Sequence, residues 1–111
     1  ITYGVSGSGK TYLAKKLCQN QPLIHLRSDI VRKKLFNSQL QIQDNSHSPY
    51  QGIYTSENIA KTYEKLAEIT QDALNSNFNV IVDATFLNKE NRKLFKELAN
   101  AFQAEFYIVT P

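Results

Sequence analysis

The fold is decided by residues 4–11, which read Gly4-Val5-Ser6-Gly7-Ser8-Gly9-Lys10-Thr11. They match the pattern G-x-x-x-x-G-K-[ST], the signature of a phosphate-binding loop, or P-loop. Glycines let the backbone wrap closely round a polyphosphate in torsions that are closed to other residues. Successive N–H groups and the amino terminus of the following helix then face the negative charge. We therefore predict that nucleotide phosphates are bound by Gly4, Ser6, Gly7, Ser8, Gly9, Lys10 and Thr11.

Two side chains of the loop and one outside it have distinct predicted roles. Lys10 reaches the β- and γ-phosphates, and the Thr11 hydroxyl ligates Mg²⁺. Asp83 ends the apolar run 80–82, and in P-loop proteins an acidic residue at that place holds the Mg²⁺ shell. The alternative is that Asp83 caps a helix or turn. The expected ligands are ATP and Mg²⁺, with the metal at Thr11 and Asp83.

Apolar periodicity predicts strands alternating with helices along the chain. Strands are expected at 1–3, 23–27, 80–82 and 105–110, and helices at 10–19, 29–36, from 55 or 56 to 77, and from 88 to 102. The order βαβααβαβ implies a parallel sheet with helices on both faces, which is an α/β fold. Residues 37–54 lack a regular pattern, and we interpret them as a long loop of the kind that often forms a lid.

Polar and apolar positions add detail to these elements. Ser28, Thr55 or Ser56, and Asn88 are predicted to cap the three later helices. Apolar spacing along the longest helix predicts core positions at Ile59, Tyr63, Leu66, Thr70, Ala73 and Leu74. Tyr50 and Tyr54 either pack the long loop down or stack on a base or sugar. His25 and His47 are interpreted as structural, because no second ligand stands at metal spacing.

Composition limits the class of protein. The hydrophobic content of 41% excludes a disordered chain, and the net charge of +3 leaves open both an ordinary solvated surface and a site for anions. No stretch is long enough for a membrane span and there is no signal peptide, so a cytoplasmic location is expected. Only three residues precede the P-loop, and we expect residues 1–111 to be an incomplete domain of a longer protein.

A second candidate site follows the strand 23–27. Asp29 and Arg32 are three residues apart, so they share one face of a short helix. In an open parallel sheet, ligands bind beyond the carboxyl ends of the strands, where Asp29, Asp83 and the P-loop would meet. Asp29 could accept a proton from a substrate hydroxyl while Arg32 holds an anionic group of that substrate. A capped helix with a surface ion pair is the alternative, and spacing alone does not decide between them.

Three segments together resemble one family of small P-loop kinases. They are residues 4–11, residues 27–36 and the segment 80–87, which reads Val-Ile-Val-Asp-Ala-Thr-Phe-Leu. That family includes predicted kinases found alone or fused to aminoglycoside-phosphotransferase-like domains, and it is related to polynucleotide kinases and zeta toxins. The resemblance implies a three-layer P-loop NTPase sandwich with strand order 2-3-1-4. It also implies that Asp29 is a general base, that Arg32 is catalytic and binds substrate, and that Thr85 helps to place the substrate.

The chain departs from this family at its carboxyl end. An arginine-bearing lid and a fifth strand with the adenine loop are missing, and phosphoryl transfer depends on such added positive charge. We therefore expect residues 1–111 alone to bind phosphate weakly and to turn over little. A missing fifth strand would also leave the fourth strand as an exposed edge, open to self-association.

The favoured function is a kinase that transfers the γ-phosphoryl of ATP to a hydroxyl of a small molecule or nucleotide. A non-catalytic nucleotide-binding or regulatory module and an NTP hydrolase remain as alternatives. A nucleic-acid partner is not favoured, because the only basic cluster contains four residues and no aromatic ladder. The sequence identifies neither the acceptor nor a preference for ATP over GTP.

Overall fold

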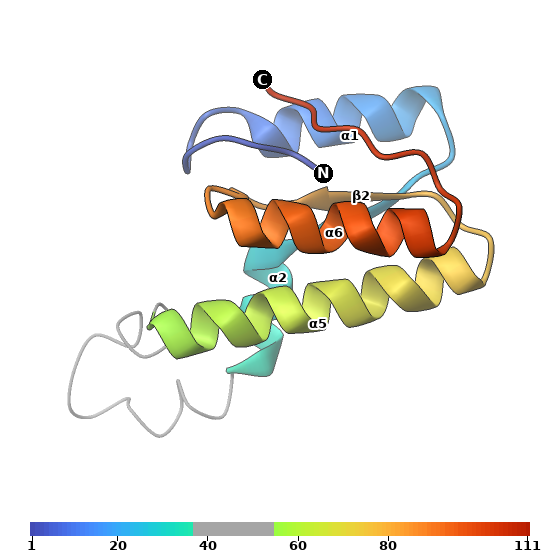
Figure 1. The fold of residues 1–111 in the computed structure, drawn as a ribbon. Coiled ribbons are helices and arrows are strands. Elements are labelled where there is room, and N and C mark those ends of the chain that lie inside the picture. The colour runs from blue at the N-terminus through green and yellow to red at the C-terminus, as the bar shows by residue number, and fades with distance from the viewer. Residues whose placement is uncertain (37–54) are drawn as a thin grey trace.

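The computed structural model describes residues 1–36 and 55–111 (Figure 1). In chain order its elements are α1 (Lys10–Asn20), β1 (Ile24–Arg27), α2 (Ser28–Leu35), α5 (Ser56–Asn75), β2 (Val80–Asp83) and α6 (Lys89–Ala101). The four predicted helices are confirmed to within two residues at each end. The predicted loop 37–54, with His47, Tyr50 and Tyr54, lies outside the described residues.

The sheet is parallel, and its neighbours follow the predicted order. β1 pairs with β2 in the register that places Arg27 opposite Asp83. On the other side of β2, the Thr2 backbone N–H donates to the Val82 carbonyl at 3.1 Å. Thr2 in turn forms a parallel bridge with Val109. Across the sheet the order is therefore β1, β2, the segment at Thr2 and the segment at Val109. This corresponds to the predicted strand order 2-3-1-4, in which strands are counted along the chain from residues 1–3.

The prediction of a strand at 105–110 is wrong, and the short strand predicted at 1–3 is reduced to one bridge residue. Apart from the isolated bridge between Thr2 and Val109, the described part of these segments forms no strand. The two segments exchange three hydrogen bonds between main-chain atoms, from Tyr3 N to Val109 O, from Val109 N to Ile1 O, and from the Ile1 amino group to Tyr107 O. That pairing is too short for a ladder, so 105–110 runs as an extended segment rather than as an edge strand.

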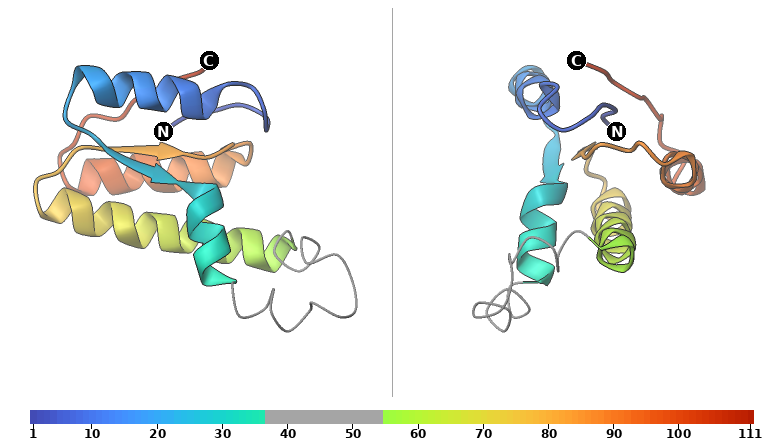
Figure 2. Two further views of the ribbon diagram at one scale, coloured as in Figure 1. Left: turned by 180° about the vertical axis from the view of Figure 1, so that it is seen from behind. Right: turned by 90° about the vertical axis from the view of Figure 1, so that its left-hand side faces the viewer.

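Helices cover both faces of this sheet (Figure 2). α1 lies against β1 and β2 on one face, and α5 and α6 pack on the other. The core between the sheet and these two helices is centred on Phe86, which is fully buried. Its ring meets those of Tyr63 and Phe95 edge-on at centroid distances of 5.2 and 5.0 Å. Such contacts fix ring orientation in addition to burying apolar area.

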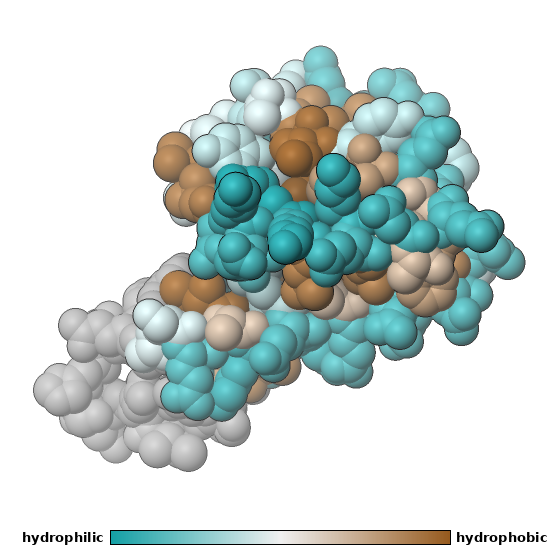
Figure 3. All heavy atoms as spheres, in the orientation of Figure 1, coloured by the Kyte–Doolittle hydropathy of each residue, from teal (hydrophilic) through white to brown (hydrophobic). Residues whose placement is uncertain are grey.

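Of the predicted core positions of α5, Leu66 is fully buried, whereas the prediction that Ile59 lies in the core is wrong. Ile59 is 40% exposed. The amino-terminal end of α5 extends past the short sheet, so its first turns have less sheet to pack on (Figure 1). The outer face of α6 is hydrophilic, with hydrophobic side chains gathered along the seams beside it (Figure 3). This agrees with the burial of Phe95 and Ala99 on its inner face.

The predicted caps are confirmed in two helices and wrong in one. Thr55 accepts a hydrogen bond from Asn58 N, and Asn88 accepts one from Glu90 N. Ser28 does not cap α2, because it is already the first helical residue. β1 runs directly into α2, so the extended residue before the helix is Arg27, which makes no side-chain cap bond.

Candidate nucleotide site

The P-loop has the backbone that its glycines predict. Gly4, Gly7 and Gly9 have φ values of 150°, 79° and 98°, in the region that disfavours other residues. A Cβ atom at Gly4 would lie 2.7 Å from Ser8 Oγ, whereas one at Gly7 would meet nothing within 4 Å. Gly4 is therefore required by a close approach, and Gly7 borders open space.

The amino terminus of α1 is left available by its sequence. Gly9 precedes the helix and supplies no side-chain cap, and no acidic residue stands in the first turn. The first N–H groups of a helix have no partner within the helix, and the helix dipole adds positive potential there. Residues 5–9 are exposed. This end of α1 has the properties of an anion-binding site.

Lys10 is held inside the loop. Its side chain is buried, and Nζ donates to the Val5 carbonyl at 2.8 Å. A buried ammonium group needs partners for its three N–H donors. The contact keeps the positive charge within the concave side of the P-loop, where a phosphate would approach it.

The predicted metal ligands are in contact with each other. Thr11 Oγ1 donates to Asp83 Oδ2 at 2.7 Å, and Asp83 is 5% exposed. This contact argues against the alternative that Asp83 serves only as a cap. The two groups fit Mg²⁺, because the ion prefers oxygen donors and typically uses one or two protein ligands beside phosphates and water. In residues 1–36 and 55–111, no group of three or more His, Cys, Asp and Glu side chains could hold a metal by itself.

Two residues of β1 also reach this region, and the sequence analysis did not assign them to it. His25 Nε2 lies 2.9 Å from Asp83 Oδ2, although His25 was interpreted as structural. Arg27 Nη2 lies 3.1 Å from Asp29 Oδ2, although the sequence predicted no role for Arg27 at the site. Both residues are polar and two apart in a strand, so they share one face of the sheet. The spacing of these two polar residues along the strand was the sequence signal that could have placed them on one face.

Asp29 lies in the first turn of α2, directly after β1. Both of its oxygens are engaged, since Oδ1 accepts from Ile30 N at 3.0 Å and Oδ2 pairs with Arg27. Arg32 follows one turn later on the same helix and is half-buried. Arg27 stands opposite Asp83 in the sheet. The Arg27–Asp29 pair, at the start of α2, therefore lies at the same sheet edge as the Thr11–Asp83 contact.

Thr85 is attached to the start of the P-loop. Its carbonyl accepts from Gly4 N at 3.1 Å, and its hydroxyl lies 3.4 Å from the Tyr63 hydroxyl. Tyr63 Oη also accepts from Phe86 N at 3.1 Å, a polar contact that its prediction as a core residue missed. The segment after β2 is therefore bonded both to the P-loop and to α5.

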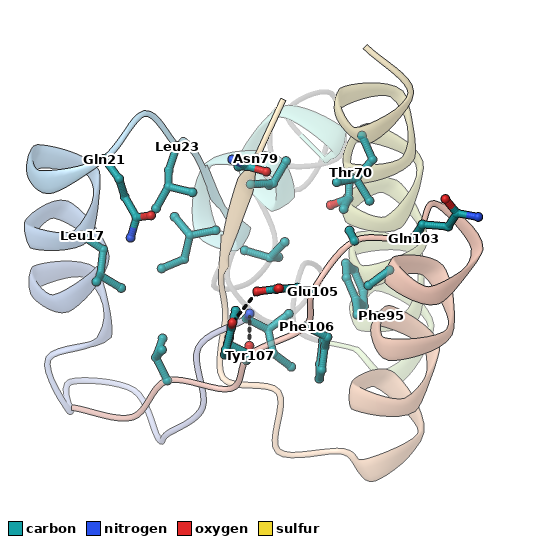
Figure 4. Close-up of a pocket in the computed structure, with 18 residues that line it drawn as sticks. Leu17, Gln21, Leu23, Thr70, Asn79, Phe95, Gln103, Glu105, Phe106 and Tyr107 are labelled. Carbon is teal, nitrogen blue, oxygen red and sulfur yellow. Dashed lines mark hydrogen bonds between the residues drawn. The ribbon is translucent and has the colours of Figure 1, made fainter. Parts of the chain in front are cut away.

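A cavity of about 580 Å³ lies away from these residues. It is situated between α1 and α6 beside β2, with Asn79, Phe106 and Tyr107 among its lining residues (Figure 4). No residue of the P-loop lines it, and neither do Asp29 or Asp83. Its position toward the amino end of β2 separates it from the carboxyl edge, where the predicted site residues gather.

Comparison with known proteins identifies the family. The model of an AAA domain family matches residues 1–111, the whole chain. The chain belongs to this family. No curated protein matches it significantly. Within residues 1–36 and 55–111, none of the helices has the length and apolar character needed to cross a bilayer.

Solved kinase structures share the fold of this AAA domain. The APS kinase CysC of Mycobacterium tuberculosis, as a cysteine-to-alanine mutant, is 20% identical with a TM-score of 0.68, over 98% of this chain and 71% of that one. A putative kinase from Chloroflexus aurantiacus is 18% identical with a TM-score of 0.69, over 98% of this chain and 54% of that one. The same APS kinase in complex with AMPPNP and APS is 20% identical with a TM-score of 0.67, over 98% of this chain and 58% of that one. The predicted α/β P-loop fold and the resemblance to small P-loop kinases are confirmed.

Proposed function

We propose that the chain is the nucleotide-binding part of a kinase that transfers the γ-phosphoryl of ATP to a hydroxyl of a small molecule or nucleotide. The observation that carries the proposal is the 2.7 Å contact between Thr11 Oγ1 and Asp83 Oδ2, directly after a loop that buries Lys10. These groups belong to segments 72 residues apart in the sequence. Two of the similar structures described above are of the same APS kinase, one of them in complex with AMPPNP and a second ligand, APS, which supports the proposal.

In the proposed reaction, the residues of the chain bind, orient and move one proton. The N–H groups of the P-loop and Lys10 hold the phosphates, and Thr11 and Asp83 hold the metal. Bound Mg²⁺ neutralises charge on the transferred phosphoryl group. Asp29, which lies beside Arg27, takes the proton of the acceptor hydroxyl. Arg32 and Thr85 hold the acceptor, so that its oxygen faces the γ-phosphorus.

Binding is tested by calorimetric titration of Mg²⁺–ATP into the chain and two lysine variants. Lys10→Ala removes a charge-assisted phosphate contact, and such contacts contribute about 1.5–3 kcal/mol, which corresponds to roughly a tenfold or greater loss of affinity. Lys15→Ala is the control, because Lys15 is exposed on the same helix outside the loop. Equal affinity of a folded Lys10→Ala variant and the unsubstituted chain would contradict the proposal.

One observation favours the alternative of a nucleotide-binding module that performs no transfer. Both oxygens of Asp29 are engaged, by Arg27 and by Ile30 N, and a general base must free one of them for the substrate. Transfer from radiolabelled ATP to a panel of nucleosides, nucleotides and APS, measured with Asp29→Asn in the full-length protein, separates the two. Loss of transfer supports the kinase, provided that Asp72→Asn, at an exposed aspartate of α5, retains it. Unchanged transfer in Asp29→Asn would remove the proposed base.

A further inference from the structure

The carboxylate of Asp83 receives two side-chain donors on the same oxygen. Thr11 Oγ1 lies 2.7 Å from Oδ2, and His25 Nε2 lies 2.9 Å from that same atom. His25 stands opposite Ile81 in the register of the sheet, two residues before the pair formed by Arg27 and Asp83. Its side chain therefore emerges on the same sheet face as that of Asp83. The imidazole reaches along this face to the carboxylate.

The chemistry of the pair fixes which group donates. An ionised carboxylate only accepts hydrogen bonds, so Nε2 of His25 carries the proton in this contact. The Asp83 side chain is 5% exposed and that of His25 is 17% exposed. A carboxylate with so little solvent around it needs protein donors, because a buried charge without them is strongly destabilising.

The arrangement distinguishes the two oxygens of Asp83. Oδ2 is taken by Thr11 and His25, whereas Oδ1 has no hydrogen bond to any residue in 1–36 or 55–111. With Oδ2 held from two sides, the carboxylate has little freedom to rotate. Oδ1 is then the oxygen that stays available to an ion or to its bound water. If His25 were removed, Thr11 alone would hold Oδ2, and the carboxylate could turn.

We propose that His25 is a positioning residue, which orients the Asp83 carboxylate for the Mg²⁺ of a Mg²⁺–nucleotide complex. The inference rests on the proposed function, because it takes Asp83 as a residue of the metal site. Partners that orient a metal ligand without touching the ion commonly change metal affinity by about 10- to 100-fold. Within the described residues, the side chain of His25 is hydrogen-bonded to Asp83 and to no residue of the P-loop. Replacing His25 should therefore weaken the binding of Mg²⁺ and leave phosphate binding by the P-loop intact.

The test compares ATP affinity with Mg²⁺ and with EDTA, by calorimetry on the same protein. The dissociation constant in EDTA divided by the one in Mg²⁺ reports the contribution of the metal. His25→Leu removes the donor, and we expect it to lower this ratio about tenfold or more while the EDTA affinity stays within about twofold. His25→Gln, whose amide nitrogen can reach as far as Nε2, should restore most of the ratio. A merely structural role would weaken both affinities equally.

The possible results test the positioning role of His25 and the metal site at Thr11 and Asp83 separately. A folded His25→Leu variant with an unchanged ratio overturns the positioning role and leaves the proposed function standing. An unsubstituted chain that binds ATP equally with and without Mg²⁺ overturns the metal site at Thr11 and Asp83, and the inference with it. If His25→Leu does not fold, His25→Gln and His25→Asn form the comparison, because the asparagine amide is too short to reach Asp83. Equal ratios in these two variants would then overturn the inference.

Discussion

The carbonyl oxygen of Phe86 accepts a hydrogen bond from Arg92 Nη1 at 2.7 Å. The same nitrogen donates to the Leu87 carbonyl at 3.0 Å, and the guanidinium lies over the ring of Tyr3 at 5.2 Å from its centroid. Phe86 has a φ of 48°, a left-handed conformation that is uncommon for a bulky residue. A conformation of this kind persists only where surrounding contacts enforce it. Arg92 is thus one of the residues that hold the turn after Asp83 in place.

Replacing Arg92 should therefore destabilise the fold. Arg92→Met keeps a long side chain but removes both hydrogen bonds, and we expect the free energy of unfolding to fall by about 1.5–3 kcal/mol. Arg92→Lys should recover only part of this, because an ammonium group lacks the planar fork of arginine. Urea denaturation measures the difference, with Lys93→Met as the exposed control on the same helix. Equal stability of Arg92→Met and Lys93→Met would refute the role of the contact.

Gly4 and Ser8 should be energetically coupled. A methyl group at Gly4 would lie 2.7 Å from Ser8 Oγ, so Gly4→Ala creates a clash as well as an unfavourable backbone torsion. In a Ser8→Ala background the clash is removed and only the torsional cost remains. We expect Gly4→Ala to cost about 1 kcal/mol less in that background, a coupling within the range for residues in contact. Unfolding of the four proteins of this cycle in urea gives the value, and strict additivity would contradict it.

Thr2 connects the start of the P-loop to the end of β2. It is fully buried, and its hydroxyl donates to Ala84 O at 2.7 Å and accepts from Ala84 N at 3.0 Å. Thr2→Val keeps the shape but leaves both backbone groups without this partner. Each unsatisfied buried group costs about 1–3 kcal/mol, so the variant should lose about 2 kcal/mol or more of stability.

Thr2→Ser is the matched control for this prediction, because it keeps the hydroxyl and removes only a methyl group. Thermal unfolding followed by circular dichroism should place Thr2→Ser well above Thr2→Val. If the valine variant were as stable as the serine variant, the hydroxyl would have no role in joining residues 1–3 to β2.

Thr11 should determine the metal dependence of nucleotide binding. Thr11→Val removes the hydroxyl, and we expect the advantage of Mg²⁺–ATP over ATP in EDTA to fall by about tenfold or more, as for a contact to a charged group. Thr11→Ser keeps the hydroxyl and should retain the advantage. Isothermal titration with and without Mg²⁺ provides the measurement. A valine variant with the full Mg²⁺ advantage would exclude Thr11 as a metal ligand.

Local sequence was sufficient where a short stretch decides its own structure. The P-loop, the four helices and the buried strand at 80–82 follow from spacing, glycine and apolar runs, and the structure contains them all. Ser28 was predicted wrongly, because its residue type suits a cap and the chain between β1 and α2 contains no loop for one. The segment 105–110 was predicted wrongly because its composition suits a strand, whereas strand formation needs a partner of sufficient length.

The contacts of Asp83 depended on information that no local pattern contains. Residue types alone suggested that Thr11 and Asp83 act together, and the structure brings them into contact. Nothing local could place His25 on Asp83, because this contact requires the register of β1 against β2. The two strands are more than fifty residues apart in the chain. Their register is set by how their side chains pack against α1 and α5, and a shift of one residue would turn every side chain of the strand to the other face.

The sequence by itself thus determined the phosphate loop, the alternation of strands and helices, and the chemical types of the residues that could act there. Those features depend on torsion preferences and periodicity, which are properties of neighbouring residues. Only the tertiary structure decided that Asp83 is held by His25 as well as by Thr11. The two contacts of Asp83 join segments 72 and 58 residues apart, and the packing of the whole core fixes which side chains meet.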